Sequence, residues 1–136
     1  MKFSVVRYGN VMGSRGSVIP MFVEAQDSGA FSITDTRMTR FNITLRYGVD
    51  FVLHSMRKMW GGEIFVPKIP SYRLVDLAEA INPTCRLDII GIRPGEKIHE
   101  SLCSVDEAEN VRRVKDHLVI IPNFIKKNKK TNYIDR

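Results

Sequence analysis

Residues 3–25 read FSVVRYGNVMGSRGSVIPMFVEA, which is an apolar segment, a glycine-rich turn and a helix-forming segment in succession. Residues 3–8 are rich in β-branched and aromatic residues and are followed by Gly9, which is typical of a buried strand that ends in a sharp turn. Ser17 is a suitable N-cap for a helix that stops near Gly29. We therefore expect the chain to begin within a strand and to continue as a strand-and-helix unit.

The rest of the chain continues this alternation. The clearest predicted helix ends at Gly61 and Gly62 and has apolar residues at helical spacing on one face, namely Leu45, Val49, Val52, Leu53, Met56 and Met59. A second helix is expected to be capped by Ser71 and to end at Asn82, and residues 35–40 are expected to be a polar connection. Further strands are predicted at residues 31–34, 63–66, 87–92 and 118–121. Strands that alternate with helices indicate an α/β fold.

The composition is that of an ordinary folded domain. The chain has 136 residues, of which 43% are hydrophobic and 26% charged, and its net charge is +6. These values exclude collagen-like repeats, a coiled coil and wholesale disorder, and the length suits one domain. The longest apolar stretch, Val18–Val23, is too short to cross a bilayer, and the N-terminal apolar segment is too short for a secretory signal. We expect a cytoplasmic protein without a membrane span, with a folded region at residues 1–125 and a basic tail at residues 126–136.

The positive charge permits an anionic partner, which could be nucleic acid, a membrane surface or a phosphorylated small molecule. Nucleic acid is disfavoured, because the aromatic residues are spread among apolar runs and are not interleaved with the basic residues. Cys85 and Cys103 form no CxxC pair and have no histidine at metal-ligand spacing. Reduced thiols and no metal site are therefore expected.

Three turns place a glycine beside residues that can hold an anion, RYGN at residues 7–10, GSRGS at 13–17 and RPGE at 93–96. The second and third turns are each predicted to precede a helix, whose first backbone amides can bind phosphate, and a nearby arginine adds charge-assisted hydrogen bonds. Glu96 beside a phosphate site suggests a carboxylate that accepts hydrogen bonds from sugar hydroxyl groups. Together these features suggest a nucleotide sugar, and a surface ion pair at a helix start is the alternative interpretation of RPGE.

Other chemistry-bearing residues are less informative. Two arginines, Arg37 and Arg40, lie in the predicted polar connection. They are expected either to contact the base or phosphate of a nucleotide or to be solvated in a surface loop. His99 opens an HExxC segment, with Cys103 where a zinc-protease helix needs its second histidine, so that motif is incomplete. The sequence contains no GxSxG, P-loop or GxGxxG motif. The residues by themselves identify no catalytic group.

Four segments carry a resemblance to a known family. They are VRYGNVMGSRGSVIP at residues 6–20, MTRFNITLRYGVDFVL at 38–53, GGEIFVPKIPS at 61–71 and GIRPGEKIHE at 91–100. In this order and spacing they resemble the C-terminal half of UDP-N-acetylglucosamine 4,6-dehydratases, which are extended short-chain dehydrogenase/reductases of bacterial polysaccharide and flagellin-sugar biosynthesis. The resemblance runs from Phe3 to about Pro122. It implies the late strands and helices of a Rossmann fold together with the small substrate-binding region.

The resemblance also implies a reaction that yields a UDP-4-keto-6-deoxy-hexose. In the family, NADP or NAD on an N-terminal domain takes a hydride from carbon 4 of the sugar and returns it to carbon 6 after water is eliminated, and some members also invert carbon 5. Carried over by motif, Tyr8 would lie near the nicotinamide. The implied substrate-binding residues are Asn10 at the diphosphate or sugar, Val18 at the cleft, Arg40 at the nucleotide, Arg93 at the phosphates and Glu96 at the ribose hydroxyl groups.

The departures from the family pattern concern catalysis. The catalytic YxxxK motif is absent, because no tyrosine has a lysine four residues later. The glycine-rich cofactor fingerprint is absent as well, so we expect that the N-terminal cofactor half is missing and that this chain contributes no catalytic residue. Asn42 stands where the family usually has an aromatic residue, so the packing around Arg40 is expected to differ.

Three hypotheses follow. The preferred one is the substrate-binding part of a truncated or split dehydratase, inactive alone, which binds UDP-N-acetylglucosamine or a related UDP-sugar and needs a complementary N-terminal fragment. The second is a non-catalytic UDP-sugar-binding module or the remnant of a truncated gene. The third, which is disfavoured, is a small basic nucleic-acid binder. Because members of the family assemble, a homo-oligomer is a further expectation.

Overall fold

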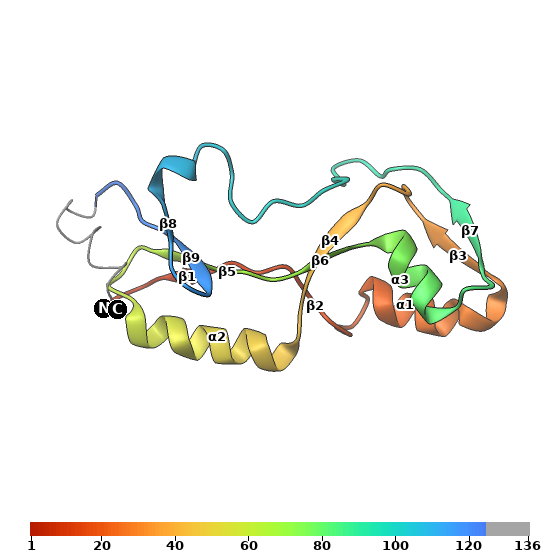
Figure 1. Cartoon of the computed structure of the whole chain (residues 1–136), viewed down its shortest axis with the longest axis horizontal. Coiled ribbons are helices and arrows are strands. Elements are labelled where there is room, and N and C mark those ends of the chain that lie inside the picture. The colour runs from red at the N-terminus through yellow and green to blue at the C-terminus, as the bar shows by residue number, and fades with distance from the viewer. Residues whose placement is uncertain (125–136) are drawn as a thin grey trace. The chain divides into compact units, whose positions relative to one another are not determined.

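The computed structural model describes residues 1–124, which form two compact units. Unit 1 consists of Met1–Tyr8, Arg46–Ile69 and the described part of Ser101–Arg136, and unit 2 consists of Gly9–Leu45 and Pro70–Glu100. Both units contain strands and helices (Figure 1), so the predicted α/β class is confirmed. The predicted basic tail at residues 126–136 lies outside the described residues.

Unit 1 is built on a four-stranded sheet with the strand order β1–β5–β9–β8. Its strands are β1 (Val5–Val6), β5 (Ile64–Pro67), β8 (Val111–Arg113) and β9 (His117–Ile120), and the 3-10 helix η2 (Ala108–Asn110) precedes β8. β1 is parallel to β5, with Val6 opposite Phe65, whereas β9 is antiparallel to both β5 and β8. The strands predicted at residues 63–66 and 118–121 are confirmed to within one residue, and no pattern in the sequence predicts β8.

The first strand is shorter and more exposed than its sequence predicts. Only Val5 and Val6 form β1, and the side chains of Phe3 and Val5 are 72% and 54% exposed. Among the described residues β1 is an edge strand, since β5 is its one neighbour in the sheet. Parallel strands are ordinarily covered on both faces, so the prediction of a buried strand over residues 3–8 is wrong in extent and in burial.

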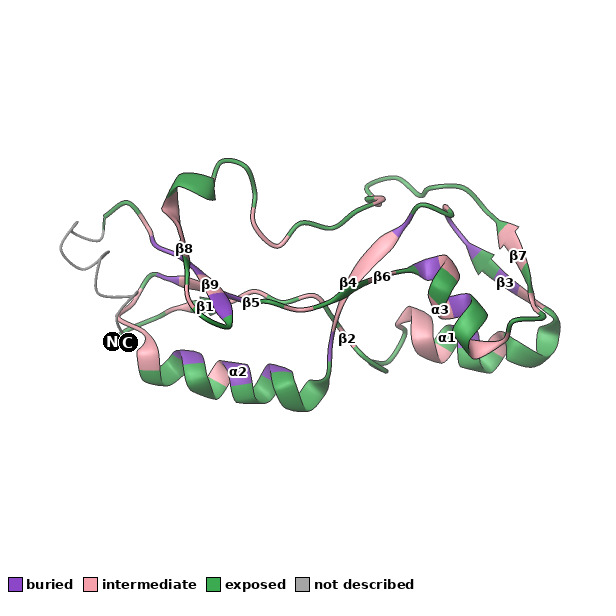
Figure 2. Cartoon of the chain, in the orientation of Figure 1, coloured by how far each residue is buried: buried purple, intermediate pink, exposed green. Residues whose placement is uncertain are grey.

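Helix α2 (Leu45–Lys58) confirms the clearest predicted helix, but another face of it packs on the sheet. The buried residues of α2 are Gly48, Phe51 and Ser55. Phe51 packs against Phe65 in the core of unit 1. The apolar stripe that the sequence reveals is largely exposed instead, with Leu45 at 68%, Val49 at 49%, Leu53 at 45% and Met56 at 63% (Figure 2). At about 100° per residue, the two faces are roughly a third of a turn apart.

Unit 2 contains a three-stranded sheet with the strand order β2–β4–β6. Its strands are β2 (Asn10–Val11), β4 (Thr39–Ile43) and β6 (Ser71–Arg73), with β2 parallel and β6 antiparallel to β4. The structure corrects two predictions, because Thr39 and Arg40 begin β4 and do not end a polar connection, and Ser71 begins β6 and does not cap a helix. Ser71 pairs with Phe41. Pairing between distant segments, which no local pattern reports, decides both outcomes.

The second part of unit 2 surrounds a separate core. Its elements are α1 (Val18–Ala25), the 3-10 helix η1 (Gln26–Ser28), β3 (Ala30–Ile33), α3 (Leu74–Ile81) and β7 (Arg86–Ile89), with β3 parallel to β7. Phe22 and Phe31 stack at a ring-centroid distance of 4.7 Å within this core. The predicted helix start after Ser17, the end at Gly29 and the strand at residues 31–34 are confirmed, with a positive φ of 78° at Gly29.

Residues 91–100 form a loop and not the short helix that RPGEKIHE predicts. The amide of Glu96 donates to the carbonyl oxygen of Arg93 at 3.0 Å, which closes a turn. Thr39 then forms an isolated β-bridge with His99, so the backbone is extended where a helix would have to continue. The idea that RPGE offers a helix N-terminus to phosphate is therefore wrong.

Gly9 is required by the close approach of β4. A Cβ atom added at Gly9 would lie 2.4 Å from Cβ of Phe41 and 3.0 Å from the Phe41 carbonyl oxygen. Because the backbone sets all these positions, Gly9→Ala is expected to lower the free energy of unfolding by about 1–3 kcal/mol, measured by urea denaturation. Gly29→Asn is the control, since asparagine tolerates a positive φ and nothing lies within 4 Å of a Cβ atom there. Equal losses in the two variants would contradict this explanation.

Candidate functional site

Arg40 is at the centre of the candidate site, which lies in unit 2. Its side chain is 12% exposed, and Nη1 donates hydrogen bonds to the carbonyl oxygens of Thr39 at 2.7 Å and Ile98 at 3.1 Å. Nη2 lies 3.6 Å from Oε1 of Glu96 and 3.1 Å from Sδ of the buried Met38. β4 supplies Arg40 and the loop after β7 supplies Glu96, so the fold brings together two predicted substrate residues that are distant in the sequence.

The turn that carries Glu96 also carries Arg93. The backbone amide of Arg93 donates to Oε2 of Glu96 at 3.3 Å. The Glu96 carboxylate is therefore held between this amide and the guanidinium of Arg40, and its side chain is 27% exposed. A carboxylate has about four lone-pair sites, so Glu96 can also accept hydrogen bonds from the hydroxyl groups of a ligand.

Two asparagines share a face of the sheet with Arg40. Arg40 and Asn42 are two residues apart on β4, and side chains alternate between faces along a strand. Asn10 on β2 is opposite Asn42, and Tyr72 on β6 is opposite Arg40, so all four side chains lie on the same face. Oδ1 of Asn42 is buried without a hydrogen-bond partner among residues 1–124, and so is Oγ of Ser17.

Two predicted site residues take no part in the contacts of Arg40 given above. Val18 is the first residue of α1 and packs, partly buried, against the core cluster that contains Phe22. Tyr8 is the last residue of the first segment of unit 1, and its side chain is 39% exposed. The position of Tyr8 near a nicotinamide and the position of Val18 at a substrate cleft both stay predictions.

His99 and Arg37 both lie apart from the contacts of Arg40. Oγ1 of Thr39 and Nδ1 of His99 are 2.8 Å apart, and Thr39 precedes Arg40 on β4, so the side chains of Thr39 and Arg40 lie on opposite faces of the sheet. In the sequence His99 stands only in an incomplete zinc motif, and its contact with Thr39 has no local signal. Arg37 is 68% exposed and pairs with Asp35 at 2.7 Å, and its hydrogen bonds hold the pKa of that carboxyl at about 2. The two arginines of one polar stretch therefore have different environments.

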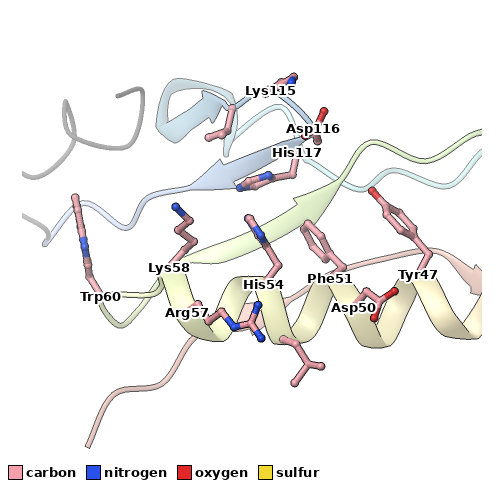
Figure 3. Close-up of a pocket in the computed structure, with 12 residues that line it drawn as sticks. Tyr47, Asp50, Phe51, His54, Arg57, Lys58, Trp60, Lys115, Asp116 and His117 are labelled. Atoms are coloured by element: carbon pink, nitrogen blue, oxygen red, sulfur yellow. The ribbon is translucent and has the colours of Figure 1, made fainter. Parts of the chain in front are cut away.

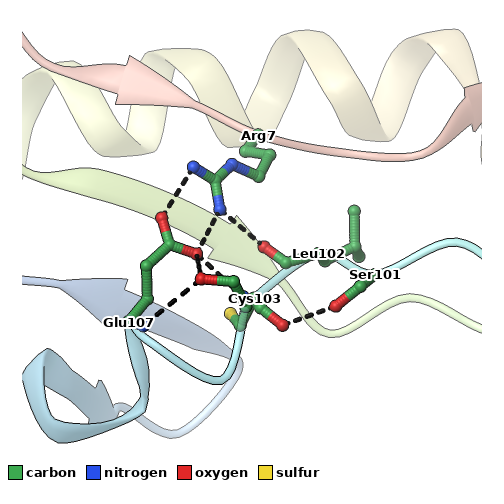
Figure 4. Close-up of polar contacts among 6 residues, drawn as sticks. Arg7, Ser101, Leu102, Cys103 and Glu107 are labelled. Atoms are coloured by element: carbon green, nitrogen blue, oxygen red, sulfur yellow. Dashed lines mark hydrogen bonds and ion pairs between the residues drawn. The ribbon is translucent and has the colours of Figure 1, made fainter.

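In unit 1, Arg7 links the first strand to a loop near the end of the described chain (Figure 4). Its guanidinium forms a bidentate pair with Glu107, at 2.8 Å from Nη1 to Oε2 and 2.9 Å from Nη2 to Oε1. Nη1 also donates to the carbonyl oxygen of Leu102 at 3.0 Å. The hydrogen bonds from Arg7 hold the pKa of Glu107 at about 2. Arg7 of the RYGN turn is thus engaged by protein groups and not presented to an anion.

Loss of this pair is expected to destabilise the protein at neutral pH but not in acid. Glu107→Gln removes the charge that pairs with Arg7, and a partly exposed bidentate pair contributes about 1 kcal/mol. Because the folded-state pKa of Glu107 is lowered, the contribution is present above its ordinary pKa of 4.5 and is lost as the pH falls toward 2. Urea denaturation at pH 7 and pH 2.5 measures this, with the exposed Glu109→Gln as control. The same deficit at both pH values would refute the assignment.

Three further classes of feature complete the description of residues 1–124. In this range no group of three histidine, cysteine, aspartate or glutamate side chains could hold a metal ion, and none of its helices has the length and apolarity to cross a bilayer. Cys85 and Cys103 are half-buried thiols. Burial raises the pKa of Cys103, which keeps this thiol protonated at neutral pH.

Comparison with known proteins shows the family of the chain. The family described as "Polysaccharide biosynthesis protein" matches residues 1–122. The chain is 51% identical over 125 residues to a UDP-N-acetylglucosamine 4,6-dehydratase (inverting) of Campylobacter jejuni. The matched region covers 90% of this chain and 37% of the dehydratase. It is 44% identical over 110 residues to a UDP-glucose 4-epimerase of Rickettsia bellii, covering 77% of this chain and 32% of the epimerase.

Among solved structures, the X-ray structure of Pen from Bacillus thuringiensis superposes with a TM-score of 0.84 at 35% sequence identity. This match covers 93% of the present chain and 41% of Pen, so the chain spans about two fifths or less of the length of these relatives. The similarity confirms the resemblance that the four sequence segments carry. The chain belongs to the polysaccharide biosynthesis protein family.

Proposed function

We propose that this chain is the UDP-sugar-binding part of a UDP-N-acetylglucosamine 4,6-dehydratase of bacterial surface-polysaccharide or flagellin-sugar biosynthesis, and that it acts in the cytoplasm. The observation that carries the proposal is the Arg40–Glu96 pair, at 3.6 Å, beside the Arg93 turn. A cation and a carboxylate held next to each other match the two features of a nucleotide sugar, its phosphates and its hydroxyl groups. The 51% identity to the Campylobacter jejuni dehydratase supports this substrate class.

Each predicted residue then has a chemical role. Arg40 approaches the nucleotide and Arg93 the phosphates, because a guanidinium binds phosphate oxygens through parallel hydrogen bonds. Glu96 accepts hydrogen bonds from the ribose hydroxyl groups, and Asn10 bonds the diphosphate or the sugar. Val18, at the start of α1, lines the cleft.

The residues of this chain do not fit NADP or NAD. Dinucleotides bind where a strand passes directly into a helix through a glycine-rich turn. Here β1 is followed by β2, and α1 starts only at Val18, after a turn whose glycines do not form that motif. Tyr8 would be the one contact to the nicotinamide. Binding of either cofactor therefore requires further polypeptide.

We infer that a complementary N-terminal region of the family covers the exposed apolar surface of unit 1. The stripe on α2 includes Val49, Leu53 and Met56, each 45–63% exposed, and Val5 of the edge strand β1 is 54% exposed. Such surface is ordinarily covered in a stable protein. The chain spans 37% of the length of the Campylobacter jejuni dehydratase, so polypeptide of the required kind exists in the family.

A non-catalytic UDP-sugar-binding module is the second candidate function. One observation favours it, that Arg40 and Glu96 form an ion pair while the YxxxK motif is absent. The two candidates predict the same binding by the isolated chain and differ in whether a complementary region restores turnover.

The binding site is tested by recording an amide-resolved NMR spectrum of the chain during titration with UDP. Under this proposal, signals of Asn10, Arg40, Arg93 and Glu96 shift saturably. The signals of Arg37 and of Glu107 are internal controls, because Arg37 is paired with Asp35 and Glu107 lies in unit 1. A well-dispersed spectrum that does not respond to UDP would refute the proposed function.

A further inference from the structure

Unit 1 contains a cavity of about 560 Å³ whose lining includes none of the proposed UDP-sugar residues (Figure 3). One wall is α2, and the other is the turn between β8 and β9. The volume is within the range of sites that bind small molecules. All residues that line this cavity belong to unit 1, whereas Arg40, Arg93 and Glu96 belong to unit 2.

The walls of the cavity are rich in flat rings. His54 on α2 and His117 on β9 make an edge-to-face contact at a centroid distance of 5.4 Å. Phe51 meets the ring of His117 at 5.6 Å and 72°. Tyr47 and Trp60 lie toward opposite ends of the cavity (Figure 3). Offset and edge-to-face arrangements of this kind favour a planar aromatic ligand, because such a ring can pack against several others at once.

The charges around the cavity favour an anion. Its lining includes three cationic side chains and two carboxylates, namely Arg57, Lys58, Lys115, Asp50 and Asp116. Asp50 also lies 3.9 Å from Arg46, so part of its charge is balanced outside the cavity. Lys68 is engaged elsewhere, since its Nζ donates to the carbonyl oxygens of Val114 at 3.1 Å and Lys115 at 2.6 Å. These bonds hold the β8–β9 turn in place.

The buried His117 is surrounded by mixed charges. Burial lowers its pKa, and His54 and Lys58 on α2 and Lys68 after β5 lower it further, whereas Asp116 raises it. His117 is therefore neutral at pH 7. A negative group in the cavity would oppose these cationic neighbours and favour protonation of His117, so such a ligand should bind more tightly as the pH falls.

We propose that this cavity binds a small molecule that combines a planar aromatic ring with a negatively charged group. Three observations support this class of ligand. They are the volume of about 560 Å³, the rings of Phe51, His54 and His117, and the excess of cationic side chains. The cavity shares no residue with the proposed UDP-sugar site and would be a second ligand site of this chain.

Benzenesulfonate is a suitable probe, because it combines a ring with a charge that does not titrate between pH 5 and 8. Trp60 is the only tryptophan of the chain, so its indole N–H gives a single NMR signal from the cavity. We expect this signal to shift saturably, with at least fivefold weaker binding of neutral benzenesulfonamide and of inorganic sulfate. Affinity should rise about twofold or more from pH 7.5 to pH 5.5.

Variants separate the cavity from general charge effects. Lys58→Gln and His54→Ala are each expected to weaken benzenesulfonate binding at least fivefold, and both positions tolerate change because His54 is exposed and Lys58 lies at the end of α2. Arg113→Gln removes the same charge from an exposed position of β8 outside the cavity and should leave affinity within twofold.

Equal binding of benzenesulfonate, sulfonamide and sulfate, equal effects of Lys58→Gln and Arg113→Gln, or no shift at Trp60 would overturn the proposal. Failure here is distinguishable from failure of the proposed function, because the UDP titration is read at Arg93 and Glu96 in unit 2.

Discussion

Turnover of UDP-N-acetylglucosamine is expected to be undetectable with the isolated chain and NADP, and to appear when the chain is mixed with the N-terminal region of a family member. No tyrosine of the chain has a lysine four residues later, so the acid–base pair is absent. A positioned acid–base group contributes about 10²–10⁴ in rate, and the hydride carrier is indispensable to the reaction. Formation of the 4-keto product, followed by chromatography of the nucleotide sugars, measures the result.

The docking surface offers matched variants for this experiment. Val49→Lys and Met56→Lys place a charge within the exposed apolar stripe of α2 and are expected to abolish at least nine tenths of the restored turnover, because burying an unpaired charge is costly. Val105→Lys makes the same kind of substitution at a position of unit 1 that is 90% exposed and outside α2, and should leave turnover within about twofold. Product formation by the isolated chain would contradict the proposal, and equal effects of all three variants would contradict the docking surface.

Arg40→Ala is expected to weaken UDP binding by about 10- to 100-fold, which corresponds to the loss of one or two charge-assisted hydrogen bonds. The substitution also leaves the carbonyl oxygen of Ile98 and the carboxylate of Glu96 without this partner, so the loop that carries Glu96 should loosen. Isothermal titration calorimetry with UDP measures the affinity, and urea denaturation reports the accompanying loss of stability.

Arg37→Ala is the matched control for Arg40→Ala. Arg37 is three residues away, is 68% exposed and pairs with Asp35, so its loss should leave UDP affinity within about twofold. Arg40→Lys should retain part of the affinity, because a lysine keeps the charge but not the planar fork. Similar losses in Arg37→Ala and Arg40→Ala would mean that net charge and not the Arg40 contacts governs binding.

Elements that depend on local patterns could be predicted from the sequence. Such patterns involve only residues that are close together in the sequence. Examples are the N-cap at Ser17, the end of the helical segment at Gly29 and the helical spacing of α2. The four family segments, which run in register through residues 6–100, predicted the family, and the match over residues 1–122 confirms it.

Features that depend on pairing between distant segments could not be predicted in this way. β4 and β6 exist because residues 39–41 pair with residues 71–73, and Thr39 then draws His99 into a bridge that keeps RPGEKIHE from forming a helix. Likewise, the sequence does not distinguish Arg37 from Arg40, because both lie in one polar stretch. Only the position of Arg40 on β4 brings its guanidinium to Glu96.

By itself, the sequence determined the α/β class and the family, because these depend on local periodicity and on motifs in a fixed order. The assignment of Arg40, Arg93 and Glu96 as substrate residues stays a prediction. Tertiary structure alone decided that the apolar stripe of α2 is exposed and that Gly48, Phe51 and Ser55 face the sheet. An apolar stripe in the sequence indicates that this face of the helix packs against something. The element against which each face packs depends on what the fold places beside the helix.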